Sequence, residues 1–273
     1  MTVTVVDAGP APGPESSPGP ERSPGPGGKP VRAELGAFLR SRRERLTPAD
    51  VGLAPGFRRR TPGLRREEVA QLAGIGVTWY TWLEQGRPIN ASGQVLEAIA
   101  RTLRLDAAER SHLHRLAAVP GGPGIGTVDR RLAPEIQTIL DGLAGLPACV
   151  YTSRYDLLAW NATYGALFPS LVVAPVERRN ALWHLFAASG CCCRFVNRGT
   201  EMPRMVAMLR GAFGRHVGDP AWTGFVDDLT QASPAFAELW AGHDVALPET
   251  TLKIFEHHIV GEVRLRVTSL EVA

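Results

Sequence analysis

The chain has 273 residues, of which 44% are hydrophobic, and a formal net charge of +3, a length that suffices for two modest hydrophobic cores. No apolar stretch approaches the roughly 20 residues of a membrane-spanning helix, and residues 1–30 lack the basic flank and apolar run of a secretory signal. We therefore expect a cytoplasmic protein with two domains and no membrane partner.

Charge is distributed unevenly along the chain. Residues 1–30 are rich in Pro, Gly, Ser and Ala, which predicts a disordered tail. Residues 31–119 hold fifteen Arg against nine acidic residues, a net +6, whereas residues 120–273 hold thirteen basic against fifteen acidic residues, a net −2. A basic domain joined to a slightly acidic one is the pattern expected when only one domain binds DNA.

The basic region begins with an amphipathic helix. Leu35, Phe38 and Leu39 lie at helical spacing, and the helix is expected to end near Leu46. We expect the basic residues of this helix to form a solvent-exposed face, namely Arg40, Arg42 and Arg43. A second basic run lies in a Pro/Gly-bounded loop directly before the next helix and is a better candidate for DNA contact: Arg58, Arg59 and Arg60.

Residues 66–86 predict two short helices around a tight turn. The first helix presents apolar residues to its partner at helical spacing, namely Val69, Ala70, Leu72 and Ala73. Gly74 adopts a positive φ without steric cost and ends this helix. The second helix is predicted from about 77 to 85, with Tyr80 and Leu83 buried. Together they give the helix-turn-helix geometry, in which the second helix enters the major groove of DNA.

Two further helices complete a small all-helical domain over residues 31–119. Ser92 is a good N-cap for a helix whose apolar face carries Leu96, Ile99, Ala100 and Leu103. Asp106 opens another helix and forms a capping-box pattern with Glu109. The Gly/Pro-rich residues 120–127 follow as the expected linker between the domains.

Residues 34–118 resemble the lambda-repressor-like (Xre-type) helix-turn-helix transcriptional regulators, specifically the actinobacterial subgroup with an MmyB-like ligand-binding domain. The stretches that carry the resemblance are ELGAFLR at 34–40, RRTPGLRREEVA at 59–70 and YTWLEQGR at 80–87. It continues more weakly through residues 128–273. It implies a multidomain α and α+β protein in which an all-helical domain precedes a PAS-like antiparallel sheet with a helical face. It also implies a homodimer on a double-stranded DNA operator.

The resemblance assigns roles to residues around the two-helix motif. Phosphate contacts, which supply most of the affinity, are implied for Arg65, Arg66, Gln85 and Arg87. Base contacts are implied for the start of the recognition helix and a position one turn later, namely Val77, Thr78 and Trp82. Relatives often carry Arg at position 82, so Trp82 either contacts bases differently or covers the core, and we interpret Trp79 as covering the core.

The second domain, residues 128–273, is predicted to have strands at both ends. Residues 148–152 and 156–161 flank a turn and predict a hairpin. Residues 251–256 and 262–268 flank a turn near Gly261, and the latter segment alternates apolar and polar side chains. Long helical segments lie between the two pairs, which indicates an α+β domain.

Aromatic residues are frequent in this domain, and any one of them is best interpreted as core. Together they can leave an irregular pocket between sheet and helices, and the resemblance implies a fatty-acid-like hydrophobic ligand. The candidate ligand-binding residues are Arg154, Trp160, Asn161, Tyr164, Trp183, Phe213 and Trp240. The alternative is a second domain that binds a protein partner or only dimerises, with no small ligand.

The sequence shows no convincing catalytic or metal-binding motif. It lacks a nucleophile elbow, a phosphate loop and a zinc-protease helix, and Asp227-Asp228 is interpreted as a solvated helix turn. Cys191-Cys192-Cys193 point in different directions in any regular element, so we interpret them as reduced, small apolar residues. We expect no enzyme activity, no cofactor other than the fatty-acid-like ligand, and no metal.

Overall fold

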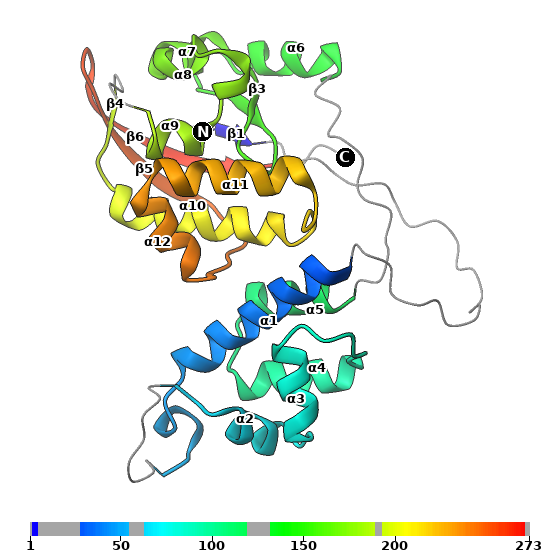
Figure 1. Cartoon of the computed structure of the whole chain (residues 1–273). Coiled ribbons are helices and arrows are strands. Elements are labelled where there is room, and N and C mark those ends of the chain that lie inside the picture. The colour runs from blue at the N-terminus through cyan, green and yellow to red at the C-terminus, as the bar shows by residue number, and fades with distance from the viewer. Residues whose placement is uncertain (1, 5–27, 55–62, 119–131, 189–192, 271–273) are drawn as a thin grey trace.

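The computed structural model describes residues 2–4, 28–54, 63–118, 132–188 and 193–270. It has an all-helical domain followed by a domain of helices and small sheets, which confirms the predicted multidomain α and α+β class. In Figure 1 the helical domain lies below the mixed domain, with α1 and α5 on the side that faces α10 and α12. Arg58, Arg59, Arg60, the predicted linker 120–127 and Cys191-Cys192 lie outside the described residues. No helix within those ranges is long and apolar enough to cross a membrane.

The first domain follows the sequence prediction closely. Ser92 accepts a hydrogen bond from the Val95 amide, and Asp106 and Glu109 form the predicted capping box. Gly74 has φ of +70° and ends the first motif helix. The helices are α1 (Gly28–Arg45), α2 (Arg66–Ala73), α3 (Val77–Glu84), α4 (Gly93–Thr102) and α5 (Ala107–Ala117), with a 3-10 turn at Ala49–Val51.

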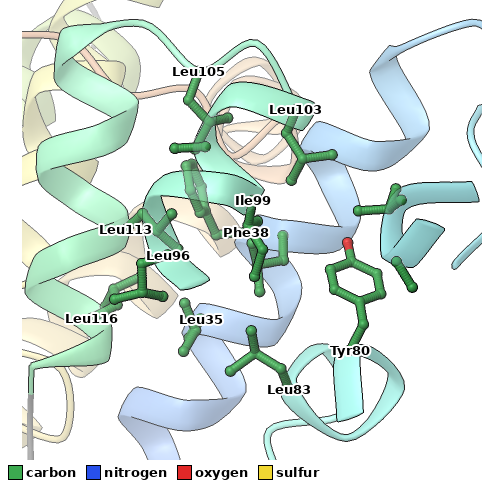
Figure 2. Packing of buried hydrophobic residues seen from close by; sticks show 14 of the residues in the cluster. Leu35, Phe38, Tyr80, Leu83, Leu96, Ile99, Leu103, Leu105, Leu113 and Leu116 are labelled. Carbon is green, nitrogen blue, oxygen red and sulfur yellow. The ribbon is translucent and has the colours of Figure 1, made fainter. Parts of the chain in front are cut away.

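One hydrophobic core joins these helices. Figure 2 shows Phe38 of α1, Leu83 of α3 and Ile99 of α4 within it, all of them buried. Tyr80 is buried as predicted, and Trp79 packs against the core from outside. Leu72 corrects the prediction for α2, because it is 40% exposed while Val69 and Ala70 form the buried face.

The second domain contains two sheets. The strands are β1 (Thr2–Thr4), β2 (Cys149–Tyr151), β3 (Leu157–Trp160), β4 (Cys193–Phe195), β5 (Thr251–His257) and β6 (Gly261–Ser269). The helices are α6 (Pro134–Gly142), α7 (Ala162–Leu167), α8 (Pro169–Val172), α9 (Ala181–Phe186), α10 (Arg198–Phe213), α11 (Pro220–Ala232) and α12 (Pro234–Ala241), with a 3-10 turn at Val176–Arg178.

Both predicted hairpins form, but they belong to different sheets. β2 and β3 pair antiparallel on their own, with Val150 opposite Ala159, and β5 and β6 pair antiparallel in a four-stranded sheet of order β1-β6-β5-β4. The expected sheet was entirely antiparallel, whereas β1 pairs with β6 in parallel. This strand also corrects the prediction of a disordered tail over residues 1–30 at Thr2–Thr4, because these residues are β-branched, unlike the Pro/Gly-rich remainder of the tail, and they pair with an open sheet edge.

Candidate DNA-binding surface and ligand cavity

The start of the recognition helix α3 faces solvent. Val77 is 47% exposed, Trp82 is 39% exposed, and Thr78 is also exposed. Tyr80 and Leu83 on the opposite side fix the helix to the core. The three side chains predicted to contact bases therefore share an accessible surface, and they offer a methyl, a hydroxyl and an indole ring to a groove.

Glu84, the last residue of α3, is buried and is held by arginines from two other elements. Arg43 of α1 donates from Nε to Glu84 Oε2 over 2.8 Å and from NH2 to Oε1 over 2.9 Å. Arg66 of α2 donates from Nε to Oε1 over 2.9 Å. Burial alone would raise the pKa of Glu84, but the two guanidinium groups outweigh it and hold the pKa below its usual value.

This network changes the interpretation of two residues. Arg43, expected on a solvated face, is buried because it pairs with Glu84, while its neighbour Arg40 is exposed as expected. Arg66, implied as a phosphate contact, uses part of its guanidinium to position the recognition helix. Of the two, only Arg66 keeps partial exposure, at 38% of its side chain.

The other predicted phosphate contacts lie just before α2 and just after α3. Arg65 is an exposed N-cap residue of α2, and its backbone N–H donates to Glu68 in a capping contact. Gln85 and Arg87 are exposed just after α3. The Arg87 guanidinium lies 5.5 Å from the centre of the Trp82 ring, a cation–π contact that orients both side chains.

The second domain contains a cavity of about 310 Å³, within the size range of small-molecule sites. Its wall is formed mainly by α10 and the inner face of the β5–β6 hairpin, together with side chains from β2, α7, α8, α9 and neighbouring loops, several of which are aromatic. Apolar residues dominate the lining and include Tyr155, Phe168, Phe195, Met205, Met208 and Leu265.

Among the residues predicted to bind a ligand, Tyr164 lies in the cavity wall. Trp160, Trp183, Phe213 and Trp240 do not line it, because they pack against other side chains instead. Arg154 is likewise absent from the lining: its guanidinium pairs with Asp156 and lies over the ring of Phe225.

Asn161 has a structural role away from the cavity. Its side-chain oxygen accepts hydrogen bonds from the amides of Ala148 and Tyr164, which caps α7. Its side-chain nitrogen donates to carbonyl oxygens in the last turn of α6 and in the loop that follows, at Leu140, Leu143 and Leu146. A single buried amide therefore ties α6, β2 and α7 together.

The cavity also contains charged residues that sequence reasoning missed. Glu201 and Arg204 contribute from α10, and Lys253 contributes from β5. A sequence signal existed for Lys253, because it alternates with Phe255 along β5 and so shares the inward face. Glu201 and Arg204 lie at i and i+3 of α10 and gave no signal beyond ordinary helical polarity.

The two domains contact each other through ion pairs made by buried arginines. Arg42 of α1, only 2% exposed at its side chain, donates to Glu109 over 3.0 Å and to Asp244 over 2.9 Å. Its guanidinium also bonds the backbone carbonyl of His243. Burial of Arg42 corrects the expected solvated face, because its partners come from α5 and from the loop after α12.

A second ion pair crosses the same boundary nearer the start of α1. Arg210 of α10 donates to the Glu34 carboxylate of α1, and His243 lies 3.7 Å from the same oxygen. Burial alone would raise the pKa of Glu34, but His243 and Arg210 outweigh it and lower the pKa. Val217 and Val245 of the second domain pack against the core of the first. The boundary is therefore a packed interface.

No group of three or more His, Cys, Asp or Glu side chains in the described part of the chain is placed to hold a metal ion. Cys149 is a buried free thiol, and burial raises its pKa to about 12, so it stays protonated at neutral pH.

Comparison with known proteins agrees with this division of the chain. Residues 34–113 match a helix-turn-helix domain, and residues 132–273 match the MmyB-like transcription regulator ligand binding domain. A protein of Sinorhizobium fredii, described as "Uncharacterized HTH-type transcriptional regulator y4mF", is 38% identical over 53 residues, which make up 19% of this chain and 70% of that protein.

Proposed function

This chain belongs to the family of DNA-binding transcription regulators that carry an MmyB-like ligand-binding domain, and we propose that its second domain senses a hydrophobic, fatty-acid-like molecule and thereby changes binding of a homodimer to a specific operator. The observation that carries the proposal is the position of α10. One helix contributes both to the cavity wall and to the contact with the DNA-binding domain.

The two faces of α10 have different partners. Met205, Met208 and Ala212 line the cavity, whereas Arg210 reaches Glu34 of α1. α1 in turn packs against the recognition helix and holds Glu84 through Arg43. A ligand that favours one position of α10 over another would favour one arrangement of this chain of contacts, which is the differential interaction that coupling between two sites requires.

The loop after α12 provides a parallel connection. Its first part, at His243 and Asp244, contacts Arg42 of the DNA-binding domain. Its later part, at Leu247 and Glu249, lines the cavity, and Glu249 pairs with Arg204 there. A ligand that displaces this loop would alter the environment of Arg42.

The proposal is tested by selecting bound sequences from a random duplex pool, with the purified protein before and after removal of bound lipid. We expect a motif with two half-sites, which a homodimer requires, and a change in affinity after lipid removal. In Arg210→Gln the affinity change should shrink, while the selected motif stays the same.

Mass spectrometry of material extracted from the purified protein distinguishes this proposal from the alternative, a second domain that binds no small ligand. A second domain that serves only dimerisation or a protein partner would release no stoichiometric hydrophobic molecule, and its operator affinity would not respond to extraction. Failure to enrich any motif would instead contradict sequence-specific DNA recognition by Val77, Thr78 and Trp82.

A further inference from the structure

The cavity wall carries charged groups that the protein itself leaves incompletely satisfied. Arg204 pairs with Glu249 and donates to the Leu247 carbonyl oxygen over 3.2 Å, and its Nε atom is buried without a hydrogen-bond partner among the described residues. The other two charged groups beside it, Glu201 and Lys253, are different, because neither has a charged or oxygen partner within the described residues.

Glu201 is 6% exposed, and its Oε2 atom is buried without a hydrogen-bond partner among the residues that the structure describes. No described cation lies within the 4.0 Å of an ion pair with it. A buried carboxylate oxygen without a donor costs free energy. Because this residue lines the cavity, a donor on a bound molecule can supply the missing hydrogen bond.

Lys253 has the complementary deficiency. Its ammonium donates to the thioether sulfur of Met205 over 3.4 Å, and a thioether is a weak acceptor. Lys253 pairs in register with Leu265, which also lines the cavity, so its side chain extends from the inward face of the sheet. Burial lowers the pKa of Lys253, and the nearby Glu201 carboxylate opposes that shift.

An unpaired acceptor and a poorly paired donor therefore face one cavity without contacting each other. A ligand carboxylate would satisfy Lys253 but would bring a like charge to Glu201, and a ligand ammonium would do the reverse. A hydroxyl group donates one hydrogen bond and accepts others at a single atom. It therefore complements both residues with one atom and without adding net charge.

We propose that the cavity recognises an apolar molecule that ends in a neutral hydroxyl, an alcohol or a phenol, whose O–H donates to Glu201 while its oxygen accepts from Lys253. The aromatic and methionine side chains of the wall hold the apolar body. This inference rests on the proposed ligand-sensing function and specifies which polar end group the ligand carries.

The remaining cationic residues of the wall, Arg115 and Arg215, have a different setting. Arg115 comes from α5 of the first domain, and Arg215 follows α10 and is exposed. Water and salt screen the charge of the exposed Arg215, whereas Arg115 is partly buried and its Nε atom has no hydrogen-bond partner among the described residues. Binding of an anionic ligand at these arginines is the alternative to binding of a neutral hydroxyl at Glu201 and Lys253, and the experiment below distinguishes the two.

The test uses the full chain after lipid removal and three probes of equal chain length: 1-dodecanol, dodecanoate and dodecylamine. Each is titrated against protein loaded with the neutral fluorophore N-phenyl-1-naphthylamine. We expect dodecanol to displace the fluorophore at a concentration about tenfold lower than either charged probe, a difference of about 1.4 kcal/mol.

Two variants test the named residues. Glu201→Gln removes the negative charge at nearly constant volume, so the preference for dodecanol over dodecanoate should fall about tenfold or reverse. Lys253→Met should weaken dodecanol and dodecanoate and improve dodecylamine. Glu262→Gln, on the exposed face of β6, is the matched control and should leave all three titrations unchanged.

Two outcomes would overturn the inference. Tighter binding of dodecanoate that is lost in Arg115→Gln and retained in Glu201→Gln would place an anion at the domain boundary. Equal binding of all three probes in every variant would show that the polar pair recognises nothing. If no probe displaces the fluorophore and extraction yields no bound molecule, the proposed ligand-sensing function fails together with the inference.

Discussion

Arg43 of α1 and Glu84 of α3 form a buried, two-point ion pair, with Nε–Oε2 and NH2–Oε1 distances of 2.8 and 2.9 Å. The Arg43 NH1 atom also donates to the Leu64 carbonyl oxygen over 2.7 Å. The planar guanidinium satisfies the carboxylate along both of its oxygens. The C-terminal end of the recognition helix is thereby fixed to the first helix of the domain.

Arg43→Met should destabilise the protein by about 3 kcal/mol, because removing one partner of a buried pair leaves an incompletely compensated charge. Arg40→Met is the matched control. Arg40 lies 3.6 Å from the same carboxylate but is 52% exposed, and loss of such a pair should cost less than about 1 kcal/mol. Urea unfolding measures both variants, and equal losses would contradict the assignment.

Gly36→Ala should destabilise the DNA-binding domain by about 1–3 kcal/mol, as overpacking does, and weaken operator binding. A Cβ atom at Gly36 would lie 2.4 Å from the Glu84 carbonyl oxygen, so α1 and α3 would have to separate. Gly224→Ala in α11 meets nothing within 4 Å and should stabilise by up to about 1 kcal/mol through helix propensity. Thermal unfolding and operator titration of both variants check this, and a stabilised Gly36→Ala protein would refute it.

Arg65→Ala and Thr78→Ala should affect DNA binding in different ways. Loss of a phosphate contact at Arg65 should weaken binding to every sequence and reduce the slope of log K against log salt by about 1. Loss of the Thr78 side chain should change the preference for particular base pairs. Titration of operator and base-substituted duplexes at several salt concentrations separates the two effects. Uniform losses for both variants would show that α3 does not contact bases.

His112 makes the stability of the protein depend on pH. It is fully buried against the Phe38 ring, and burial, followed by the Arg115 charge, lowers its pKa from 6.5 to about 3. As pH falls below 6.5, the unfolded chain binds a proton at this residue, whereas the folded chain does not bind it until about pH 3. Stability is therefore lost with falling pH over this window, by about 2 kcal/mol between pH 7 and pH 5.

His112→Leu should remove this part of the pH dependence, whatever its effect at pH 7. The measurement is urea unfolding of wild type and variant at pH 7 and pH 5. His258→Leu, at an exposed position, is the control and should keep the wild-type difference. A difference of the same size in His112→Leu would assign the pH dependence to other groups.

Local patterns in the sequence predicted much of the fold. Helix caps such as Ser92 and Asp106 act within three residues along the chain, so the start of a helix can be predicted from them without knowing the fold. The same holds for the alternation in β6, where Leu265 is buried and Arg264 and Arg266 are exposed. The assignment of the two hairpins to different sheets and the parallel pairing of Thr2–Thr4 with β6 depend on distant segments, so no local pattern predicts them.

The cavity was harder to predict than the DNA-binding surface. The exposed face of α3 follows from one helix and its buried side, and Val77, Thr78 and Trp82 lie where helical spacing places them. The cavity wall combines several helices and strands, and its membership depends on which rings pack against each other. Trp160 and Trp240 are aromatic residues of the same domain as Tyr164, and the sequence does not distinguish them from it. Their rings contact the Arg179 and Arg210 guanidinium groups, whereas Tyr164 lines the cavity.

The charged interface between the domains limits how freely they can be exchanged with those of other regulators. Glu34 and Arg42 belong to the DNA-binding half, while Arg210 and Asp244 belong to the other half. A chimera that keeps one half and replaces the other would bury a charge opposite a residue that does not match it. A functional chimera of these regulators should therefore require that all four residues are transferred together, because they determine whether a DNA-binding domain and a ligand-binding domain can pack against each other.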